Sequence, residues 1–541
     1  MAKYNKKIRL VKKRLAKHKY LVYNLVCTNQ YTGGILMLEN ILTKETISFK
    51  DLEEIAFKIA CEFANEILRN MLEEYDKKIM NSRDTKKFRH KGKETTTVKA
   101  KTGLVEYTRT KYIQKQENGK NKCVYLTDEI LNIKEMGQIS GGVIELIVQN
   151  ISEVSYRVCA EMISKMTGLS ISGVGVWNIV QKLGEEIKQY EKEKVEAHQS
   201  DKLQPGTKET PTIYQEADGI MIYTQGKDRK EQIEKYKKEH PNEEVPNKVR
   251  NIEIKLGMTY EGWKEIGKNR YELVGKEYVA GYMTGEEIAN ITNANLHSKY
   301  DMNKVELRVL NSDGGSWIKR LLVTKAIYQA DSYHLKEKIA THVRDTEDSE
   351  ILKSMFYKKE YSKMIEYVEA LKYKYDGEVE EVEKLNELQR YLNKRKETMK
   401  RYKDYDGVKQ KLKTYSKKTG LKYRNMGCQE SNNYCRLTRR MKKKRMSWSK
   451  NGSENIAKVI TMYASESCTD IIRHLNIQIL PESFTEYAER YIAKIEENIK
   501  EMKKKKVKTK ELYTFKQGSL EGYPQLKKIL ENKPISELIY R

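Results

Sequence analysis

Apolar residues recur at helical spacing in the segment KDLEEIAFKIACEFANEILRNMLEEYDKKIM, which begins at Lys50. Ile55, Ile59, Phe63 and Ile67 fall on one face, and this period predicts an amphipathic helix. From residue 93 the pattern changes to KETTTVKAKTGLVEYTRTKYIQKQENGKNKCVYL, where Thr, Val and Tyr dominate and the turn signals KTG and ENGK intervene. We expect a small antiparallel sheet with hairpins here. Residues 1–135 are therefore predicted to form an N-terminal helical and β-hairpin region.

The segment SYRVCAEMISKMTGLSISGVGVWNIVQKLGEEI (155–187) has two helical patterns separated by the glycine-centred break TGLSIS. Ser170 or Ser172 is the expected cap of the second helix. The pattern indicates a helix-turn-helix-like DNA-binding region over 136–203, and an ordinary helical hairpin is the alternative. The stretch LQPGTKETP (203–211) holds two of the seven prolines and marks the clearest domain boundary.

Beyond this boundary the pattern alternates as β-strands do, in TIYQEADGIMIYTQ (212–225), NIEIKLGMTYEGW (251–263) and RYELVGKEYVAGYM (270–283). A helical pattern, GEEIANITNANL, precedes a strand that ends at Asp313; a helix and the short strand AIYQAD follow. The polar residues 226–250 are expected to be a surface loop or a disordered insert. By analogy, this order of elements is that of a ribonuclease-H-like α/β core.

From 345 to about 415 the sequence is helical and heavily charged, with apolar stripes that indicate a helical insertion. The predicted fold is thus α/β, with a ribonuclease-H-like core interrupted by an all-helical insertion and preceded by the small β-rich and helix-turn-helix-like region. We place the first part of the core at 208–345, the insertion at 346–420, the closing helix of the core at 421–475 and a basic C-terminal tail at 476–541.

The net charge of the chain indicates the kind of partner that it binds. The chain carries 104 Lys and Arg against 77 Asp and Glu, a net charge of +27, which favours a polyanion and nucleic acid first of all. An AT-rich genome, which would raise the lysine content everywhere, is the alternative explanation. Seven cysteines without a Cys-x-x-Cys pair argue against a disulfide framework and a structural zinc site, and indicate a reduced, cytoplasmic protein. There is no apolar run of about 18 residues, so no membrane span is expected.

Two acidic residues are predicted to meet. Asp218 lies in the first strand of the core, in QEADG, and Asp313 ends the fourth, in NSDGGSWI. In a core of this order these strands are neighbours. Two adjacent carboxylates repel each other unless a proton or a cation lies between them, and Mg²⁺ prefers such oxygen ligands. Gly314 and Gly315 would then let a phosphate approach the backbone; an ordinary strand-to-helix turn is the alternative.

A third carboxylate is expected at Glu430, in GCQE, with Glu454 in NGSEN as its competitor. The chain after Glu430 is strongly basic and suits the gripping of DNA phosphates. Trp448 would stack on a base or anchor the core. The predicted DNA-binding residues are Arg436, Arg439, Arg440, Lys442, Lys443, Lys444, Arg445 and Trp448.

The motifs EADG, NSDGGSWI, ADSYHLKEKI and GCQESNNYCRLTRRMKKKRMSWSKNG, in this order, resemble insertion-sequence transposases of the ISLre family, second type, relatives of the Mutator-like group. The resemblance spans roughly residues 90–475. It implies a ribonuclease-H-like core in which Asp218, Asp313 and Glu430 bind Mg²⁺, with Mn²⁺ as a substitute. Asp331 and His334 match the Asp-x-x-His signature of the Mutator-like group, which implies a supporting role; on general grounds His334 would instead be a packing residue.

The resemblance implies a DNA transposase that cleaves and transfers strands at the ends of its element. Its partners would be element ends and target DNA, and it would act as a homo-oligomer in the cytoplasm, at the nucleoid. Two alternatives remain. One is a non-catalytic DNA-binding protein, a domesticated or decayed copy; the other is a nuclease of the same fold.

Overall fold

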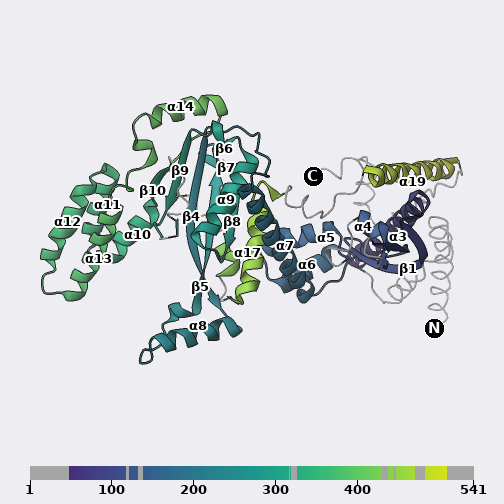
Figure 1. Ribbon diagram of the computed structural model, residues 1–541, viewed down its shortest axis with the longest axis horizontal. Helices are drawn as coiled ribbons and strands as arrows, with labels where there is room; N and C mark the ends of the chain where they lie inside the picture. Colours follow the sequence, from purple (N-terminus) through teal and green to yellow (C-terminus); the bar gives the residue numbers. More distant parts are fainter. Residues whose placement is uncertain are drawn as a thin grey trace, which may run out of the picture.

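The computed structural model describes residues 48–116, 121–131, 138–315, 317–318, 326–427, 437–442, 446–468 and 482–508. The molecule is elongated, with a helix-and-hairpin unit at one end, a mixed sheet in the middle and a helical bundle at the other end (Figure 1). None of the helices in the described ranges is long and apolar enough to cross a membrane.

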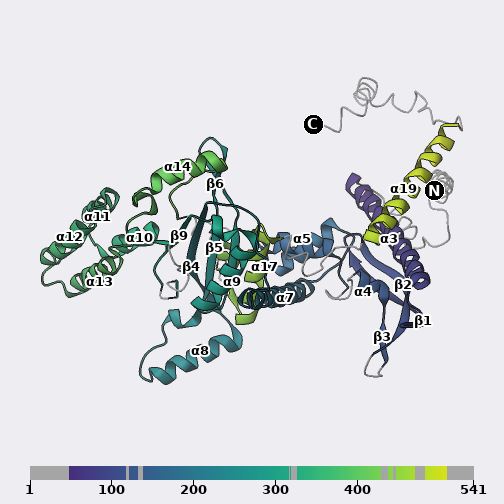
Figure 2. The same cartoon turned by 45° about the horizontal axis from the view of Figure 1, so that its top comes forward.

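The N-terminal unit is built on α3 (Phe49–Ser82), which begins at a capping box between Ser48 and Asp51. The antiparallel strands β1 (Phe88–Ala100), β2 (Gly103–Lys115) and β3 (Asn121–Val124) form the expected small sheet, and the short helix α4 (Leu126–Ile130) follows. Part of the predicted basic tail also belongs here. Residues Glu482–Lys508 form the helix α19, which lies across α3 (Figure 2) and places Phe484 edge-on against Tyr75. The aromatic residues at the start of α19 explain why it docks.

Three helices, α5 (Gly141–Ile151), α6 (Tyr156–Met166) and α7 (Gly173–Gln199), connect this unit to the sheet. Ser172 is the cap of α7, since its hydroxyl accepts a hydrogen bond from the amide of Gly175 at 3.1 Å. The break between α6 and α7 lies where the sequence predicts it. The apolar stripe of α7, which includes Val176, Val180 and Leu183, packs into the central core.

The central sheet has the strand order β10-β9-β4-β5-β8, and the two-residue strand β11 (Ser447–Trp448) pairs with β4. Its strands are β4 (Thr212–Thr224), β5 (Asn251–Tyr260), β8 (Glu277–Gly281), β9 (Leu307–Ser312) and β10 (Ile327–Ala330). β9 and β10 run parallel to β4, while β5 is antiparallel to both β4 and β8. The α/β class is therefore confirmed. Two of the predicted strands, 251–263 and 270–283, are each divided in the structure. β6 (Gly262–Gly267) and β7 (Arg270–Val274) form a separate hairpin instead of continuing β5 and β8.

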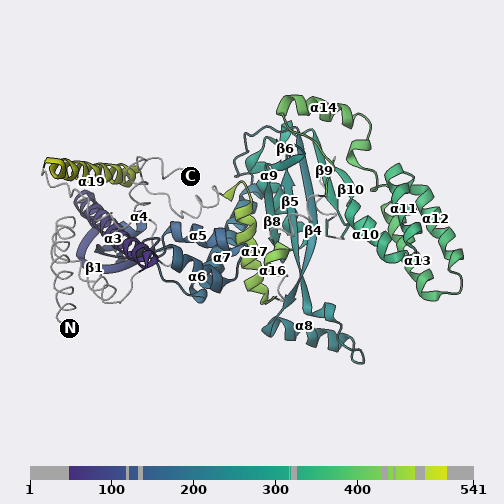
Figure 3. The same ribbon diagram turned by 180° about the vertical axis from the view of Figure 1, so that it is seen from behind.

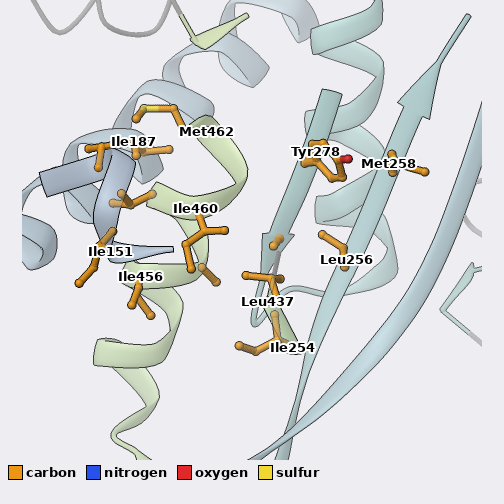
Figure 4. Packing of buried hydrophobic residues seen from close by; sticks show 14 of the residues in the cluster. Ile151, Ile187, Ile254, Leu256, Met258, Tyr278, Leu437, Ile456, Ile460 and Met462 are labelled. Atoms are coloured by element: carbon orange, nitrogen blue, oxygen red, sulfur yellow. The ribbon is translucent and has the colours of Figure 1, made fainter. Parts of the chain in front are cut away.

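Helices cover both faces of this sheet. On one face, α9 (Gly285–Lys299) contributes Ile288 and Ala289 to a cluster with Ala217 and Leu310. On the other face, α17 (Lys450–Ala464) lies between α7 and the sheet (Figure 3). Figure 4 shows Ile456 and Ile460 of α17 among apolar side chains from β5, β8 and the neighbouring helices. This larger core fixes the strands that carry the candidate site.

Residues 226–250 differ from the expected loop. They contain the helix α8 (Gly226–Glu239) and the short 3-10 helix η1 (Asn247–Arg250), which project beyond the far ends of β4 and β5. No side chain of α8 is buried. Lys227 and Glu231, one turn apart, form an ion pair of the kind that supports exposed helices.

The segment after the sheet is helical, as the sequence predicts. It comprises α10 (Ser332–His342), α11 (Thr346–Lys358), α12 (Tyr361–Lys374) and α13 (Val379–Arg395), which share a core of their own. That core already includes Leu335 and Ile339 of α10, so the bundle begins before residue 346. The chain then returns through η4 (Tyr402–Asp404) and α14 (Val408–Thr419). The remaining short elements are η2 (Met302–Lys304) and α16 (Arg439–Met441).

Candidate active site

Three aspartates follow one row of the sheet. Ser312 of β9 is the register partner of both Ala217 in β4 and Ala330 in β10, and these three strands are parallel. The next residues along the chain are Asp218, Asp313 and Asp331. Residues at equal register on parallel strands point to the same face, and neighbouring strands lie about 4.8 Å apart. The fold thus brings together Asp218 and Asp313 as predicted, and adds Asp331 beside them.

These aspartates surround a small pocket whose volume, about 10 Å³, admits about one water molecule. Asp218 accepts a hydrogen bond from the amide of Gly219 at 2.7 Å, and Asp313 accepts one from the amide of Gly315 at 2.9 Å. The second contact is that of a turn, which is the ordinary explanation of the DGG sequence. The pocket is lined by Ala217, Asp218, Asn311, Ser312, Asp313, Asp331, Tyr333, His334 and Gly427.

A buried polar layer supports the row of aspartates. Two residues before each aspartate stand Glu216, Asn311 and Gln329, which again share one register row. The Gln329 amide donates to the Asn311 side-chain oxygen at 2.9 Å, and Asn311 in turn donates to Asp331 Oδ2 at 2.6 Å. Glu216 accepts from the Tyr260 hydroxyl at 2.6 Å. Because buried polar groups are costly unless paired, these bonds order the polar layer, and the bond from Asn311 anchors Asp331 directly.

Asp331 is anchored by three hydrogen bonds. It is the N-cap of α10, where Oδ1 accepts from the amides of Tyr333 and His334, while Oδ2 receives the bond from Asn311. Its role in this structure is to hold the start of α10 against the sheet. That placement carries His334 to the pocket.

His334 faces the carboxylates and is partly buried. Its Nε2 lies 4.0 Å from Asp218 Oδ1, and its Nδ1 lies 3.4 Å from Glu337 Oε2. The side chain keeps 31% of its surface exposed. A protonated imidazole here would neutralise part of the negative charge of the row; a neutral one would accept or donate a hydrogen bond to a ligand.

Arg395 reaches the same place from the helical bundle. Its Nη2 donates to the main-chain oxygen of Asp313 at 2.5 Å, and its guanidinium lies 3.9 Å from the centre of the Tyr391 ring. Gly314, at φ +86°, leaves the space that this contact needs, because a Cβ there would come within 2.6 Å of the guanidinium. Burial is the main cause that raises the pKa of Tyr391 to about 12; Arg395 opposes it, and Asp313 and Asp331 add to it.

The third predicted acid, Glu430, lies outside the described residues, as do Arg436, Lys443, Lys444 and Arg445. The described chain before this gap ends at the pocket. Gly427 lines it, and the amide of Gly427 donates to Glu216 Oε1 at 3.5 Å. The segment that carries Glu430 therefore starts from the site.

The competitor, Glu454, serves packing. Its Oε1 accepts from the amide of Tyr282 at 2.9 Å, and its Oε2 lies 3.7 Å from Lys188 Nζ. These contacts join α17, α7 and the end of β8. Since β8 is two strands away from β4, Glu454 is remote from the pocket lining.

Two of the predicted DNA-binding residues are in the core. Arg440 is 2% exposed, donates from Nε to the main-chain oxygen of Ile151 at 2.7 Å and lies 5.0 Å from the Trp448 ring. Burial lowers the pKa of Arg440. Trp448 is buried and donates from Nε1 to the main-chain oxygen of Met441. In this structure neither side chain is open to a phosphate or a base, so Trp448 is a core anchor. Arg439 and Lys442 are exposed.

Carboxylate oxygens are the donors that a hard divalent cation prefers, and Asp218 and Asp313 offer them at the pocket. No group of three or more His, Cys, Asp or Glu arranged to hold a metal ion occurs within the described part of the chain. The described residues therefore supply two carboxylates of a candidate cation site.

Sequence reasoning missed Glu216, Asn311, Gln329 and Arg395. A signal for the first three was present, since each aspartate ends a tripeptide of a polar residue, a small residue and Asp: EAD, NSD and QAD. In a parallel sheet this repeat places two polar rows on one face. Nothing local to Arg395 marks it.

Fold and site together define an α/β protein with a row of carboxylates just beyond the last residues that pair three neighbouring parallel strands. Residues 42–473 match the family described as Uncharacterised protein family (UPF0236), and the chain belongs to this family. A search of curated proteins finds no match.

Proposed function

We propose that this protein is the DNA transposase of a bacterial insertion sequence, of the ISLre family, second type. It would cleave and transfer DNA strands at element ends with the help of Mg²⁺. The observation that carries the proposal is the row formed by Asp218 and Asp313 on adjacent parallel strands, with His334 Nε2 at 4.0 Å from the first of them. Such paired carboxylates are suited to metal-assisted phosphoryl transfer.

The strand order supports a ribonuclease-H-like core. Three successive strands that start the core, β4, β5 and β8, form an antiparallel series, and β9 and β10 then add in parallel on the other side of β4. A ribonuclease-H-like core has this order and these directions. The helical bundle interrupts the core after β10, in agreement with the insertion that the resemblance implies.

In this proposal Asp218 and Asp313 hold the divalent cation, together with Glu430. When bound, the cation supplies charge neutralisation at the phosphate and activates the attacking oxygen. Asp331 does not need to be a ligand, because its oxygens already accept hydrogen bonds from α10 and Asn311. His334 would contact a DNA strand end and Arg395 would keep the Asp313 turn in place. The protein would act on cytoplasmic, nucleoid DNA as a homo-oligomer.

The test uses Asp313→Asn, which keeps the size of the side chain and can still accept the bond from Gly315. We expect DNA binding and thermal stability to remain, while Mg²⁺-dependent nicking of the element end falls on the order of a thousandfold or more, because the cation loses a ligand. Asp376→Asn is the matched control, since Asp376 is an exposed residue of the helical bundle. Equal nicking by wild type and Asp313→Asn would remove Asp313 from the mechanism.

The same assay separates the alternatives. A wild-type protein that binds element ends but does not cut them with Mg²⁺ or Mn²⁺ would be the non-catalytic DNA-binding protein. A protein that cuts but never joins a strand to target DNA would be a nuclease. Glu430→Gln and Glu454→Gln, compared side by side, assign the third acid, and only the first of them should abolish nicking.

A further inference from the structure

The sign of the charge changes abruptly at the end of α13. Residues 346–393 contain eight Lys and Arg against twelve Asp and Glu, whereas residues 394–424 contain thirteen Lys and Arg against three Asp and Glu. We call residues 394–424 the basic strip. A genome-wide enrichment in lysine would raise both segments alike, so the contrast belongs to this protein's surface.

The basic strip follows one edge of the sheet. Near its start, Arg395 contacts the main-chain oxygen of Asp313. The main-chain oxygen of Thr398 then accepts from the amide of Ala330 in β10 at 2.7 Å, and the amide of Tyr402 donates to Gln329 at 2.9 Å. These contacts hold the chain against β10, the edge strand that stands next to β9.

The strip ends on α14, at the opposite end of the parallel strands. The Tyr415 hydroxyl donates to Glu306 Oε2 at 2.7 Å, and Glu306 immediately precedes β9. Figures 1 and 3 show α14 beyond this end of the sheet. The basic strip therefore leads from the aspartate pocket along the β10 edge to the far end of the sheet.

α14 presents its charge outward. Val408, Leu412 and Tyr415 form its buried face. Its lysines are all exposed, at Lys409, Lys411, Lys413, Lys417 and Lys418, and Lys422 and Arg424 after the helix are exposed as well.

The charges of the strip are not neutralised locally. Where the structure describes the chain, no ion pair joins a lysine of α14 to a carboxylate, and one of the three acids of the strip, Asp404, pairs with Lys359, the C-cap residue of α11. The bundle is different, because its lysines pair with acids one turn away, as Lys353 does with Glu350 at 2.7 Å. Unneutralised, ordered positive charge is the electrostatic footprint of a polyanion site.

The closeness of positive charges within the basic strip also indicates a polyanion site. Burial is the main cause that lowers the pKa of Lys403, and the nearby positive charges of Arg424 and Arg401 lower it further. Like charges held this close repel one another, and a bound polyanion would relieve the repulsion.

We propose that the basic strip binds the phosphate backbone of double-stranded DNA and carries the flank of the substrate to the aspartate pocket. The partner is a duplex, because proteins that bind unpaired bases present exposed aromatic side chains for stacking. None of the four tyrosines between residues 394 and 424 is exposed. The inference rests on the proposed function only for the reason that DNA reaches the pocket. The binding surface itself follows from the positive charge of the basic strip and its position along the sheet.

The test replaces Lys409, Lys413 and Lys417 of α14 by glutamine in one variant. The matched control replaces three lysines of the helical bundle by glutamine, at Lys353, Lys363 and Lys372, and so removes the same net charge. Binding of full-length protein to a fluorescent element-end duplex is measured by anisotropy over a range of salt concentrations. Thermal unfolding verifies that both variants remain folded.

We expect the α14 variant to bind on the order of tenfold to a hundredfold more weakly near 0.1 M salt. The slope of log affinity against log salt should fall by about 2 to 3, since each lost phosphate contact removes about 0.9. The control should stay within about twofold of wild type. Equal weakening of both variants, an unchanged α14 variant, or tighter binding of single-stranded DNA or RNA than of duplex would overturn the proposal.

The two proposals fail separately. Duplex binding that depends on α14 without any nicking leaves the basic strip intact and refutes the transposase. Nicking by the α14 variant at the wild-type rate and affinity refutes the strip and leaves the transposase intact.

Discussion

Replacing Asn311 is the most direct test of the polar layer under the aspartates. It is buried, accepts from Gln329 and donates to Asp331, and so replacing it by alanine removes two hydrogen bonds at once. The side-chain amide of Gln329 and one oxygen of Asp331 would each lose a partner. A buried polar group left unpaired costs about 1–3 kcal/mol, so two such groups set an upper range of about 2–6 kcal/mol.

Two features of the structure lower this range. Gln329 keeps its second bond, since its Oε1 still accepts from the amide of Tyr402. The aspartate pocket adjoins Asn311 and has room for about one water molecule, which can replace the lost partner of Asp331. We therefore expect Asn311→Ala to lower the free energy of unfolding of the core by about 2 kcal/mol. For a unit of about 200 residues that is a decrease of about 4–8 °C in Tm.

The assay is thermal unfolding followed by tryptophan fluorescence, because Trp263 is buried against the sheet. Asn393→Ala is the matched control, an exposed asparagine of α13. In a double-mutant cycle, Asn311→Ala and Gln329→Ala should show a coupling of about 1 kcal/mol. A Tm of Asn311→Ala within about 1 °C of wild type, or additive single effects, would refute the polar layer as a support of the site.

Two further predictions concern stability. Arg440→Ala should lower Tm by several degrees, because it leaves the main-chain oxygen of Ile151 unpaired in the core. Arg439→Ala, at the exposed neighbouring residue, is the control and should leave Tm unchanged. Equal shifts of Tm in the two variants would contradict the buried placement of Arg440. Glu287 belongs to the capping box of α9, and the hydrogen bond from the Thr284 amide is the main cause that lowers its pKa. The charge of Glu287 therefore stabilises the fold above the ordinary Glu pKa, and this stabilisation is lost as pH falls through the lowered pKa. Tm measured from pH 7 to pH 3 should accordingly show wild type about 1–2 °C above Glu287→Gln at pH 7 and equal to it at the acid end, and a gap that widens with acid would contradict this assignment.

Much of the site was accessible from local patterns. Alternating apolar residues located the strands of Asp218 and Asp313, and the order of elements made those strands neighbours, as they are. The resemblance brought in Asp331 and His334, which the fold places at the same pocket. The pattern could not identify Arg440 as buried, because a lysine- and arginine-rich segment looks the same whether one of its members points outward or into the core.

Other features depended on contacts between distant segments. The helix α19 docks on α3 across more than 400 residues of chain, and composition alone described it as a basic tail. Arg395 is an ordinary residue at the end of a charged helix until the bundle is folded against β9. The side-chain bonds of Asn311 exist only once β9 and β10 are in register.

The sequence by itself determined the secondary structure of most segments, the α/β class and the strands that carry Asp218 and Asp313, because helical and strand periods and turn residues are local properties of the chain. Only the tertiary structure decided which polar residues share a row, which arginine is buried and where the basic strip leads. Register, burial and the path of a surface depend on how segments far apart in sequence pack, and each of them is fixed by many weak contacts that no single segment contains.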